Sequence, residues 1–293
     1  MIEFNTITKE KECRELWEKF SEKKILWDLW DFRFCFHTKD FAFNFIVGRE
    51  NGHDIGILPL VYYNPNRSYT YFGDEFPEQN KFLIKDKKNV KLFLENCPAN
   101  TKIDYIDSKE AEHYQLKLGD KRYFLDLEKH ANSFETFLKS FNKKHRKNLT
   151  YDLKKLKEKG YILEKNHIED FEQLIHLNKG RFGHESTFHD VEFAESMKVF
   201  TQTALRMGLL DLLTIKIDGN KEAVGLGVIY NRVYYVLALG RNAAIKNLGK
   251  LLVVEQIKSA ISHQCSEINF LSTESAWKEL WNFDSEQMYK FET

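Results

Sequence analysis

The strongest chemical signal in the chain is a basic run over residues 139–159, which contains nine Lys or Arg residues and only two acidic ones. Its densest part reads Lys143-Lys144-His145-Arg146-Lys147. Such a run is either a solvated helix face or a surface that attracts an anion, such as a CoA phosphate, a tRNA backbone, a sugar nucleotide or a phospholipid headgroup. The sequence leaves both interpretations open.

A second candidate site is the loop over residues 241–247 together with the helix start that follows, Leu248-Gly249-Lys250. A glycine lets the backbone approach an anion closely, and a helix N-terminus offers free N–H groups. Because the loop follows a predicted strand at residues 233–239, its position favours phosphate binding. A glycine near a helix start is also common without any function.

A third group of polar side chains joins two predicted helices, in residues 178–186. Arg181, His184, Glu185 and Ser186 could contact a substrate there or move a proton. The alternative is an interhelix turn that contains glycine and an exposed arginine.

Near the C-terminus, Lys278 stands between Trp277 and Trp281. A cation in apolar surroundings must meet an anion or a polarised carbonyl to offset its desolvation. Glu274 is the nearest acidic candidate for a general base, although a helix-capping role suits it equally well. The tryptophans alone could be aromatic anchors for the terminal segment.

No metal site is expected. The four cysteines lie far apart in the sequence, and the ten histidines form no His-Glu-x-x-His pattern. Metal-dependent hydrolysis is therefore disfavoured.

The elements that would position these groups are a mixture of helices and strands. An amphipathic helix is predicted at residues 9–24 and a hairpin at 41–63, around the Asn51-Gly52 turn. One long helix is predicted from Asn132 to Gly160, and two more near residues 168–181 and 191–207. An antiparallel meander over 209–239 then leads into a helix at 248–262 and a strand at 267–271. This order predicts a mixed α/β (α+β) fold, neither a doubly wound parallel sheet nor an all-β sandwich.

The composition limits the class of protein. The chain has 293 residues with 44 basic and 44 acidic side chains, a length that fits one large domain or two. The zero net charge removes any global attraction to DNA or to an anionic membrane. No apolar run is long enough for a transmembrane segment, and the N-terminal residues lack a signal-peptide pattern. A cytoplasmic location is expected.

Together these segments resemble the GNAT superfamily of N-acyltransferases, in particular its CelD-like and FemAB-like branch, in which two GNAT-type domains lie in tandem. The resemblance rests on the order of five motifs: residues 143–149, Arg181-Phe182-Gly183, the Asp218-Gly219 hairpin, residues 247–252, and Trp277-Lys278. It implies a divergent GNAT-like domain in residues 1–130, which shapes the acceptor side or is structural. A donor-binding GNAT domain would follow in residues 131–293. Each domain would hold a mostly antiparallel mixed sheet flanked by helices.

The resemblance implies a transferase that moves an acyl group from acyl-CoA to an amine, such as an amino sugar or another small amine. Leu237 and Leu239 would line the acyl-donor strand, and Lys278 would stabilise negative charge on the transferred acyl group. The catalytic base would be Glu274, Glu185, His184 or a bound water. The donor phosphate would be held by the backbone around Lys246, Asn247, Leu248, Gly249 and Lys250. Substrate would contact Arg181, His184, Glu185, Ser186 and Trp277.

Two alternative functions remain open. A Fem-type peptidyltransferase would take an aminoacyl group from tRNA, which would contact Lys143, Lys144, Arg146 and Lys147. A non-catalytic GNAT-fold binding protein would explain why the CoA loop departs from the family pattern, Arg/Gln-x-x-Gly-x-Gly/Ala. Leu251 stands where that pattern has a small residue, and this substitution is expected to narrow the approach to a pyrophosphate.

Overall fold

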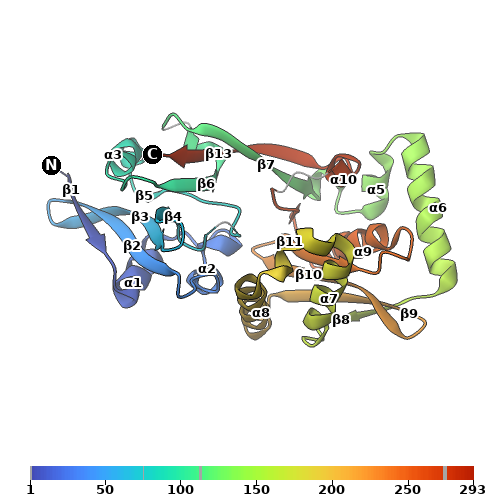
Figure 1. The fold of residues 1–293 in the computed structure, drawn as a ribbon. Helices are drawn as coiled ribbons and strands as arrows, with labels where there is room; N and C mark the ends of the chain where they lie inside the picture. Colours follow the sequence, from blue (N-terminus) through green and yellow to red (C-terminus); the bar gives the residue numbers. More distant parts are fainter. Residues whose placement is uncertain (1, 75, 112–113, 273–275) are drawn as a thin grey trace. The chain divides into compact units, whose positions relative to one another are not determined.

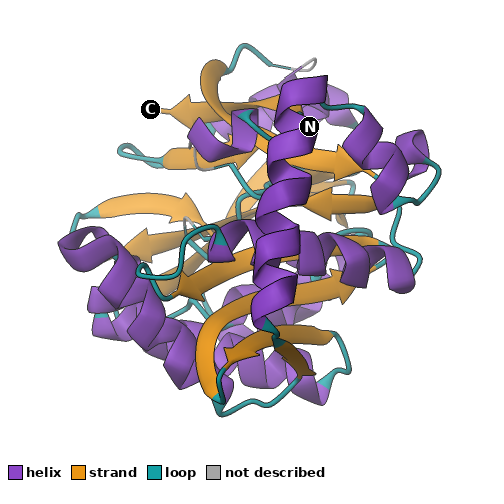
Figure 2. Ribbon diagram, turned by 90° about the vertical axis from the view of Figure 1, so that its right-hand side faces the viewer, coloured by secondary structure: helices purple, strands orange, loops and turns teal. Residues whose placement is uncertain are grey.

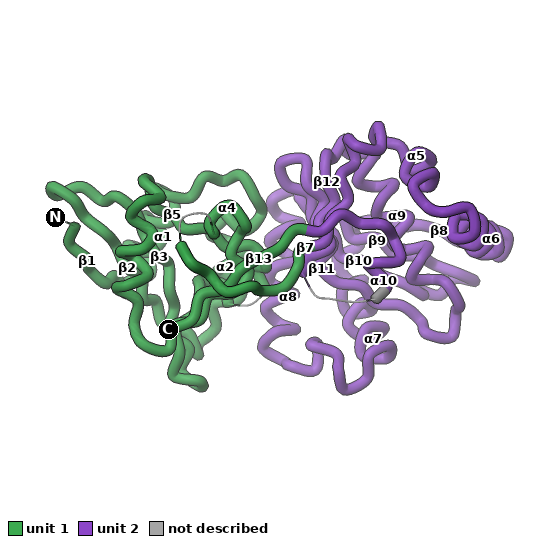
Figure 3. The backbone as a smooth tube through the Cα atoms, turned by 90° about the horizontal axis from the view of Figure 1, so that it is seen from above, with its two compact units in different colours: residues 1–122, 286–293 green, residues 123–285 purple. Residues whose placement is uncertain are grey.

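A computed structural model describes residues 2–74, 76–111, 114–272 and 276–293, in two compact units. Unit 1 comprises residues 1–122 and 286–293, and unit 2 comprises residues 123–285 (Figure 3). The chain passes from unit 1 to unit 2 through β7 (Lys117–Asp126) and returns through β13 (Asp284–Glu292). The division into GNAT-type domains at residues 130 and 131 stays a prediction.

Unit 1 is built on an antiparallel sheet in the order β1-β2-β3-β4, with β5 also paired to β3. The predicted hairpin is confirmed, because Asn51 and Gly52 both have positive φ angles, as a two-residue turn between twisted strands requires. A further strand, β6, pairs antiparallel with β13. The strands and helices that begin in unit 1, apart from β7, are β1 (Ile2–Ile7), α1 (Glu10–Phe20), α2 (Trp30–Phe34), β2 (Phe41–Glu50), β3 (His53–Tyr63), β4 (Ser68–Tyr71), β5 (Leu83–Ile84), α3 (Val90–Glu95), β6 (Lys102–Ile106) and α4 (Ser108–Ala111) (Figure 1).

The core of unit 1 is strongly aromatic. Trp30 stacks on Phe34 and on Phe43, with ring centroids 5.7 and 5.6 Å apart, and it lies 4.5 Å from the ring of Phe72. Aromatic rings bury large apolar areas and prefer such offset and tilted contacts. This cluster accounts for part of the high phenylalanine content of the chain.

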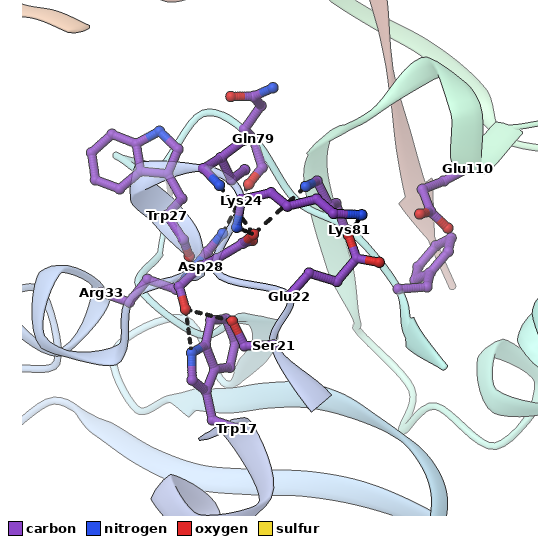
Figure 4. Close-up of polar contacts among 12 residues, drawn as sticks. Trp17, Ser21, Glu22, Lys24, Trp27, Asp28, Arg33, Gln79, Lys81 and Glu110 are labelled. Carbon is purple, nitrogen blue, oxygen red and sulfur yellow. Dashed lines mark hydrogen bonds and ion pairs between the residues drawn. The ribbon is translucent and has the colours of Figure 1, made fainter. Parts of the chain in front are cut away.

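A buried arginine lies beside this aromatic core. Arg33 is 2% exposed, and its guanidinium lies over the rings of Trp17 and Tyr71, 5.3 and 4.8 Å from their centroids. Its donors bond four acceptors from three segments: the carbonyl oxygens of Trp27 (2.5 Å), Phe72 (2.7 Å) and Gln79 (2.8 Å), and Oδ1 of Asn80 (2.9 Å). Arg33 therefore ties together chain segments that are far apart in the sequence. Figure 4 shows neighbouring polar contacts, in which the carbonyl oxygen of Asp28 accepts from Trp17 and Ser21.

Unit 2 contains a mixed sheet in the order β12-β11-β10-β9-β8, with the end of β7 paired to β12. The predicted meander is confirmed as β9, β10 and β11, which are antiparallel neighbours, while β11 and β12 run parallel. The helices and strands of unit 2, apart from the ends of β7 and β13, are α5 (Phe134–Lys139), α6 (Lys143–Lys159), β8 (Ile162–Lys165), α7 (Asp170–Phe182), α8 (Val191–Arg206), β9 (Leu210–Ile217), β10 (Asn220–Tyr230), β11 (Val233–Arg241), α9 (Leu248–Ser262), β12 (Glu267–Asn269) and α10 (Ala276–Glu279) (Figures 1 and 2).

Two glycines show that α9 and α7 cover opposite faces of the unit 2 sheet. A Cβ atom on Gly225 of β10 would lie 3.0 Å from the amide nitrogen of Gln256 in α9. A Cβ atom on Gly240 of β11 would lie 2.4 Å from the carbonyl oxygen of Leu174 in α7. Gly240 pairs with Val224, the neighbour of Gly225, and successive strand residues point to opposite faces. The sheet is therefore enclosed between the two helices.

The single helix predicted from Asn132 to Gly160 is wrong in one respect, because the structure divides it into α5 and α6. Asn142 interrupts it: its side chain accepts a hydrogen bond from the N–H of His145 and so caps the start of α6. Ser133 caps α5 in the same way, through Thr136. The periodic spacing of apolar residues continues across the break, which explains why the pattern alone predicts one helix.

Candidate active site

The predicted donor strand, β11, has a free edge where its pairing with β12 stops. Parallel pairing covers only Val233 to Tyr235, although β11 continues to Arg241. Leu226 pairs with Ala238 and Gly227 with Val236, so Leu237 is an extra residue that forms a bulge. In the described part of the chain, no strand pairs with the β12-facing edge of residues 236–241. The backbone groups on this edge are therefore not used by a neighbouring strand of the described part of the chain.

The loop after β11 presents free backbone N–H groups at the start of α9. Asn247 adopts the left-handed conformation (φ 65°, ψ 5°) immediately before the helix. The N–H groups of Lys246, Asn247 and Gly249 donate no hydrogen bond to any residue that the structure describes. Together with the dipole of a 15-residue helix, they form a cradle suited to an anion.

The substitution at Leu251 does not narrow this loop. Leu251 is buried in a core cluster with Leu213 and Ile215, so its side chain points into the protein. Leu248 is buried in the same cluster, which leaves only its backbone available to a ligand. The sequence-based expectation that Leu251 obstructs a pyrophosphate is therefore wrong.

Arg241 lies against the start of α9, and its charge is influenced by that of Arg181. A Cβ atom on Gly249 would lie 3.0 Å from both Cδ and Nε of Arg241, so the arginine side chain passes directly over this glycine. The pKa of Arg241 is lowered, first by burial and second by the positive charge of Arg181. Two cations held near each other without an acidic partner are unfavourable unless an anion joins them.

The other two basic residues next to the loop differ in their partners. Lys250 forms an ion pair with Asp152 of α6, with 2.7 Å between Nζ and Oδ2. Lys246 is exposed to solvent. Of the basic side chains around the loop, Arg241 is the one that lies against the backbone of Gly249.

A hydrogen-bonded pair links α7 to β11. The side chain of Asn178 donates from Nδ2 to the carbonyl oxygen of Leu239 at 2.7 Å. The hydroxyl of Ser186 donates to Oδ1 of Asn178, also at 2.7 Å, and Ser186 is only 5% exposed. Ser186 therefore contacts β11 only indirectly, through Asn178. By contrast, the exposed side chains of His184 and Glu185 make no hydrogen bond or ion pair within the described ranges.

The predicted cation at the C-terminal end is buried. Lys278 of α10 is 4% exposed, its Nζ donates to the carbonyl oxygen of Leu271 at 3.2 Å, and it lies 5.2 Å from the ring centroid of Tyr123. The same carbonyl accepts the N–H of Tyr123, and Leu271 has a left-handed φ of 62°, which is costly for a leucine. Lys278 is thus held at a strained turn just after β12.

Two other residues near the C-terminus were predicted to belong to the site, Trp277 and Glu274. Trp277 packs against Phe270 and Phe283, with ring centroids 6.0 and 6.1 Å away, so its contacts in the structure are core contacts. Glu274, the candidate general base, lies outside the described residues.

Sequence reasoning did not single out Arg241, Asn178 or Tyr123. Arg241 carried a usable signal, because it is the first residue of the loop that predicted a phosphate site. Asn178 and Tyr123 carried none, since their roles depend on contacts with residues 61 and 148 positions away in the chain.

No group of three or more His, Cys, Asp or Glu side chains in the described ranges is arranged to hold a metal ion. Likewise, none of the helices formed by these residues combines the length and apolarity that crossing a bilayer requires.

Two comparisons of the sequence with known proteins gave one match. Residues 143–279 match the sequence profile described as "Acetyltransferase (GNAT) domain". A search of curated protein sequences gave no significant match.

Solved structures resemble the whole chain at low sequence identity. FemX is 11% identical with a TM-score of 0.65, and the match covers 98% of this chain and 96% of that one. L-PGS from Bacillus licheniformis is 10% identical with a TM-score of 0.59, covering 97% and 91%. A tandem GNAT protein from the clavulanic acid biosynthesis pathway is 11% identical with a TM-score of 0.52, covering 99% and 97%. Residues 143–279 therefore carry a GNAT acetyltransferase domain, within a chain that has the tandem GNAT, FemAB-like fold.

Proposed function

We propose that this protein is an N-acyltransferase that transfers an acyl group from acyl-CoA to an amine acceptor, such as an amino sugar or another small amine. One observation carries the proposal. Free N–H groups of Lys246, Asn247 and Gly249 meet the side chain of Arg241 at the start of α9, with Arg181 close by. Backbone donors and guanidinium groups together suit a pyrophosphate, which is the anionic part of CoA nearest the acyl arm.

The open edge of β11 would hold the acyl arm of the donor. An extended amide-containing chain can bond to an unpaired strand edge, and this edge begins at the bulge of Leu237. The bond between Asn178 and the Leu239 carbonyl would fix the far end of the same edge. The pyrophosphate cradle follows directly after it in the chain, so one ligand could occupy both.

The chemistry requires few protein groups. The amine nitrogen attacks the thioester carbon, a C–N bond forms, the C–S bond breaks, and the CoA thiol leaves. The amine proton passes to a base, for which Glu274, Glu185, His184 and a bound water remain candidates. Negative charge develops on the carbonyl oxygen, and the proposed role of Lys278 is to stabilise it.

The direct test is release of free CoA thiol from acetyl-CoA and longer acyl-CoAs, with glucosamine and other small amines as acceptors. The proposal expects thiol release that depends on the amine, together with an N-acylated product detected by mass spectrometry. Binding of acyl-CoA without turnover of any amine would favour the non-catalytic alternative.

Gly249→Val is expected to weaken acyl-CoA binding by at least tenfold. A side chain at this position displaces Arg241 and covers the free N–H groups at the start of α9. Gly180→Val is the matched control, because a Cβ atom at Gly180 of α7 meets nothing within 4 Å and its φ is not left-handed. The measurement is the rise in Tm with acetyl-CoA concentration for each variant. Equal affinity for acyl-CoA in both variants would show that the start of α9 is not part of the donor site. If acetyl-CoA does not raise the Tm of the native protein, acyl-CoA is rejected as the donor.

A second candidate donor is an aminoacyl-tRNA, and the surface of α6 favours it. Lys143, Lys144, Arg146 and Lys147 lie in the first turns of α6, which holds no acidic residue there, and none of the four forms an ion pair in the described part of the chain. Cations at a helix N-terminus oppose the helix dipole, by roughly 0.3–1 kcal/mol each. This arrangement costs stability, which a bound polyanion would restore. Figure 1 shows α6 at the outer edge of its own unit. The side chains of Lys143, Lys144 and Lys147 are exposed, and that of Arg146 is partly exposed.

Neutralising these four residues to glutamine is expected to abolish most tRNA binding and to lower the slope of log Kobs against log salt by about 3. The matched control neutralises Lys154, Lys155, Lys157 and Lys159, which removes the same charge from the opposite end of the same helix. Filter binding of bulk tRNA between low and moderate salt measures the affinity and the salt slope of each quadruple variant. If the two quadruple variants behave alike, α6 acts only through its total charge. If the native protein does not bind tRNA, this donor is rejected.

A further inference from the structure

Unit 1 has a surface hollow of about 320 Å³ that the proposed acyl transfer does not use. It lies on strands β6, β7 and β13, and all of its lining belongs to unit 1. This "unit 1 hollow" is lined by Lys102, Asp104, Tyr105, Leu118, Gly119, Asp120 and Lys290. Its volume is at the lower end of the range for ligand pockets, so it fits only a small molecule.

A bulge in β6 shapes the hollow. Tyr289 of β13 pairs with Ile106, and Phe291 pairs with Ile103, so Lys290 lies opposite both Asp104 and Tyr105. Tyr105 has a left-handed φ of 53°, which is unfavourable for a bulky side chain. Bulges re-aim side chains and are common beside functional sites.

A buried network holds this bulge in place. Asn80 is 1% exposed, its N–H donates to the carbonyl oxygen of Tyr105 at 2.8 Å, and its Nδ2 donates to that of Asp104 at 2.7 Å. Oδ1 of Asn80 accepts from Nη1 of Arg33. Arg33, held by its own hydrogen bonds, thus fixes Asn80, and Asn80 fixes the strained pair that lines the hollow. Strain persists only where the surrounding structure enforces it, as it does here.

The charges of the hollow are separated between its two sides. On the β6 side, Lys102 and Asp104 are already paired, at 2.7 Å. Lys290 has a long contact of 3.4 Å with Glu292, which Lys117 also contacts at 2.8 Å. A shared carboxylate leaves the Lys290 ammonium incompletely neutralised.

On the β7 side, Asp120 forms no ion pair with any residue of the described ranges, and it is exposed. Its backbone is fixed, because Nε2 of Gln287 donates to the carbonyl oxygens of Gly119 (2.7 Å) and Asp120 (3.3 Å). Leu118, two residues earlier on the same strand, is 68% exposed and supplies an apolar surface. The hollow therefore offers a cation that shares its carboxylate partner with Lys117, an exposed anion and an apolar wall.

We propose that the unit 1 hollow binds a small zwitterion of the α-amino acid or short-peptide class. The carboxylate of the ligand meets Lys290, its ammonium group meets Asp120, and its apolar part lies between Tyr105 and Leu118. The site goes beyond the proposed function, since it requires neither acyl-CoA nor the unit 2 residues.

The test is isothermal titration of the full chain with glycylglycine and with two blocked forms of it. N-Acetylglycylglycine lacks the ammonium group, and glycylglycinamide lacks the carboxylate. The expected result is millimolar binding of glycylglycine and at least tenfold weaker binding of each blocked form. Lys290→Gln is expected to weaken glycylglycine binding about tenfold and to abolish the preference for the dipeptide over its amide. Asp120→Asn is expected to abolish the preference over the acetylated form.

Lys121→Gln is the matched control, because Lys121 is exposed on the same strand but points to the opposite face from Asp120. It is expected to bind glycylglycine as the native protein does. No binding at about 50 mM dipeptide, equal binding of the blocked forms, or tighter binding of inorganic phosphate than of dipeptide would each overturn the proposal. Retained secondary structure by circular dichroism checks that every variant is folded.

Discussion

Replacing Arg33 with methionine is expected to lower the free energy of unfolding of unit 1 by about 3–5 kcal/mol. Methionine keeps most of the side-chain volume but offers no donors. Four buried acceptors then lose their partner: the carbonyl oxygens of Trp27, Phe72 and Gln79, and Oδ1 of Asn80. Each buried acceptor left unsatisfied costs about 1–3 kcal/mol. The rings of Trp17 and Tyr71 also lose a cation above their faces.

Burial is the reason that this arginine needs its hydrogen-bond acceptors. It lowers the pKa of the Arg33 guanidinium to about 10, with opposing contributions from Tyr71 and Asp28, so the group still carries its charge at neutral pH. Burying an unpaired charge would be far more costly than burying one with four hydrogen bonds. Arg33→Lys keeps the charge but not the planar fork, and is expected to lie between Arg33→Met and the native protein.

Urea unfolding followed by circular dichroism measures the effect, and hydrogen exchange of β2 and β3 assigns it to unit 1. Arg14→Met is the control: Arg14 is exposed and has one ion pair, with Asp31 at 3.2 Å, so its loss is expected to cost no more than about 1 kcal/mol. A loss below 1 kcal/mol for Arg33→Met would mean that water or rearranged donors satisfy the four acceptors, and that Arg33 is not essential to unit 1.

The sequence predicted those elements of unit 2 whose conformation depends on residues close together in the chain. The meander is specified by β-forming runs separated by Asp218-Gly219 and Asn231-Arg232, and all four residues adopt positive φ as tight hairpin turns require. The phosphate loop was predicted from a glycine after a strand, and its start lies where expected, at Leu248. These features depend on neighbours within a few residues.

Features that depend on distant contacts could not be predicted in the same way. β13 pairs with β6, some 180 residues earlier, and its short alternating sequence carries no strong strand signal. Arg241 and Arg181 approach each other only because β11 and α7 pack together, through the missing side chain of Gly240. Leu251 was judged from its position in a motif, while its effect depends on which face of α9 it occupies. A linear pattern gives residue types but not the face on which each one lies.

Replacing Lys278 with methionine is expected to lower kcat for acyl transfer by about 10²–10³-fold with little change in the Kd for acyl-CoA. The prediction follows from where the structure holds this cation: it is nearly fully buried, just after β12, at the strained Leu271 turn. A charge that is already desolvated and oriented can stabilise developing negative charge without reorganisation. The proposed donor contacts lie at Lys246, Asn247, Gly249 and Arg241, so ground-state binding would not depend on Lys278.

The competing explanation is that Lys278 only supports the Leu271 turn, and the two roles separate in different measurements. A supporting role predicts that Lys278→Met lowers Tm while kcat per folded molecule stays near the native value, because the N–H of Tyr123 still donates to the Leu271 carbonyl. A catalytic role predicts the loss of kcat even in preparations with native circular dichroism and native acyl-CoA affinity. Lys258→Met, which removes an exposed lysine paired with Glu255 on α9, controls for the loss of one positive charge. A native kcat in Lys278→Met would show that Lys278 does not stabilise the oxyanion. The backbone N–H groups around Leu237, at the unpaired edge of β11, would then be the candidate donors.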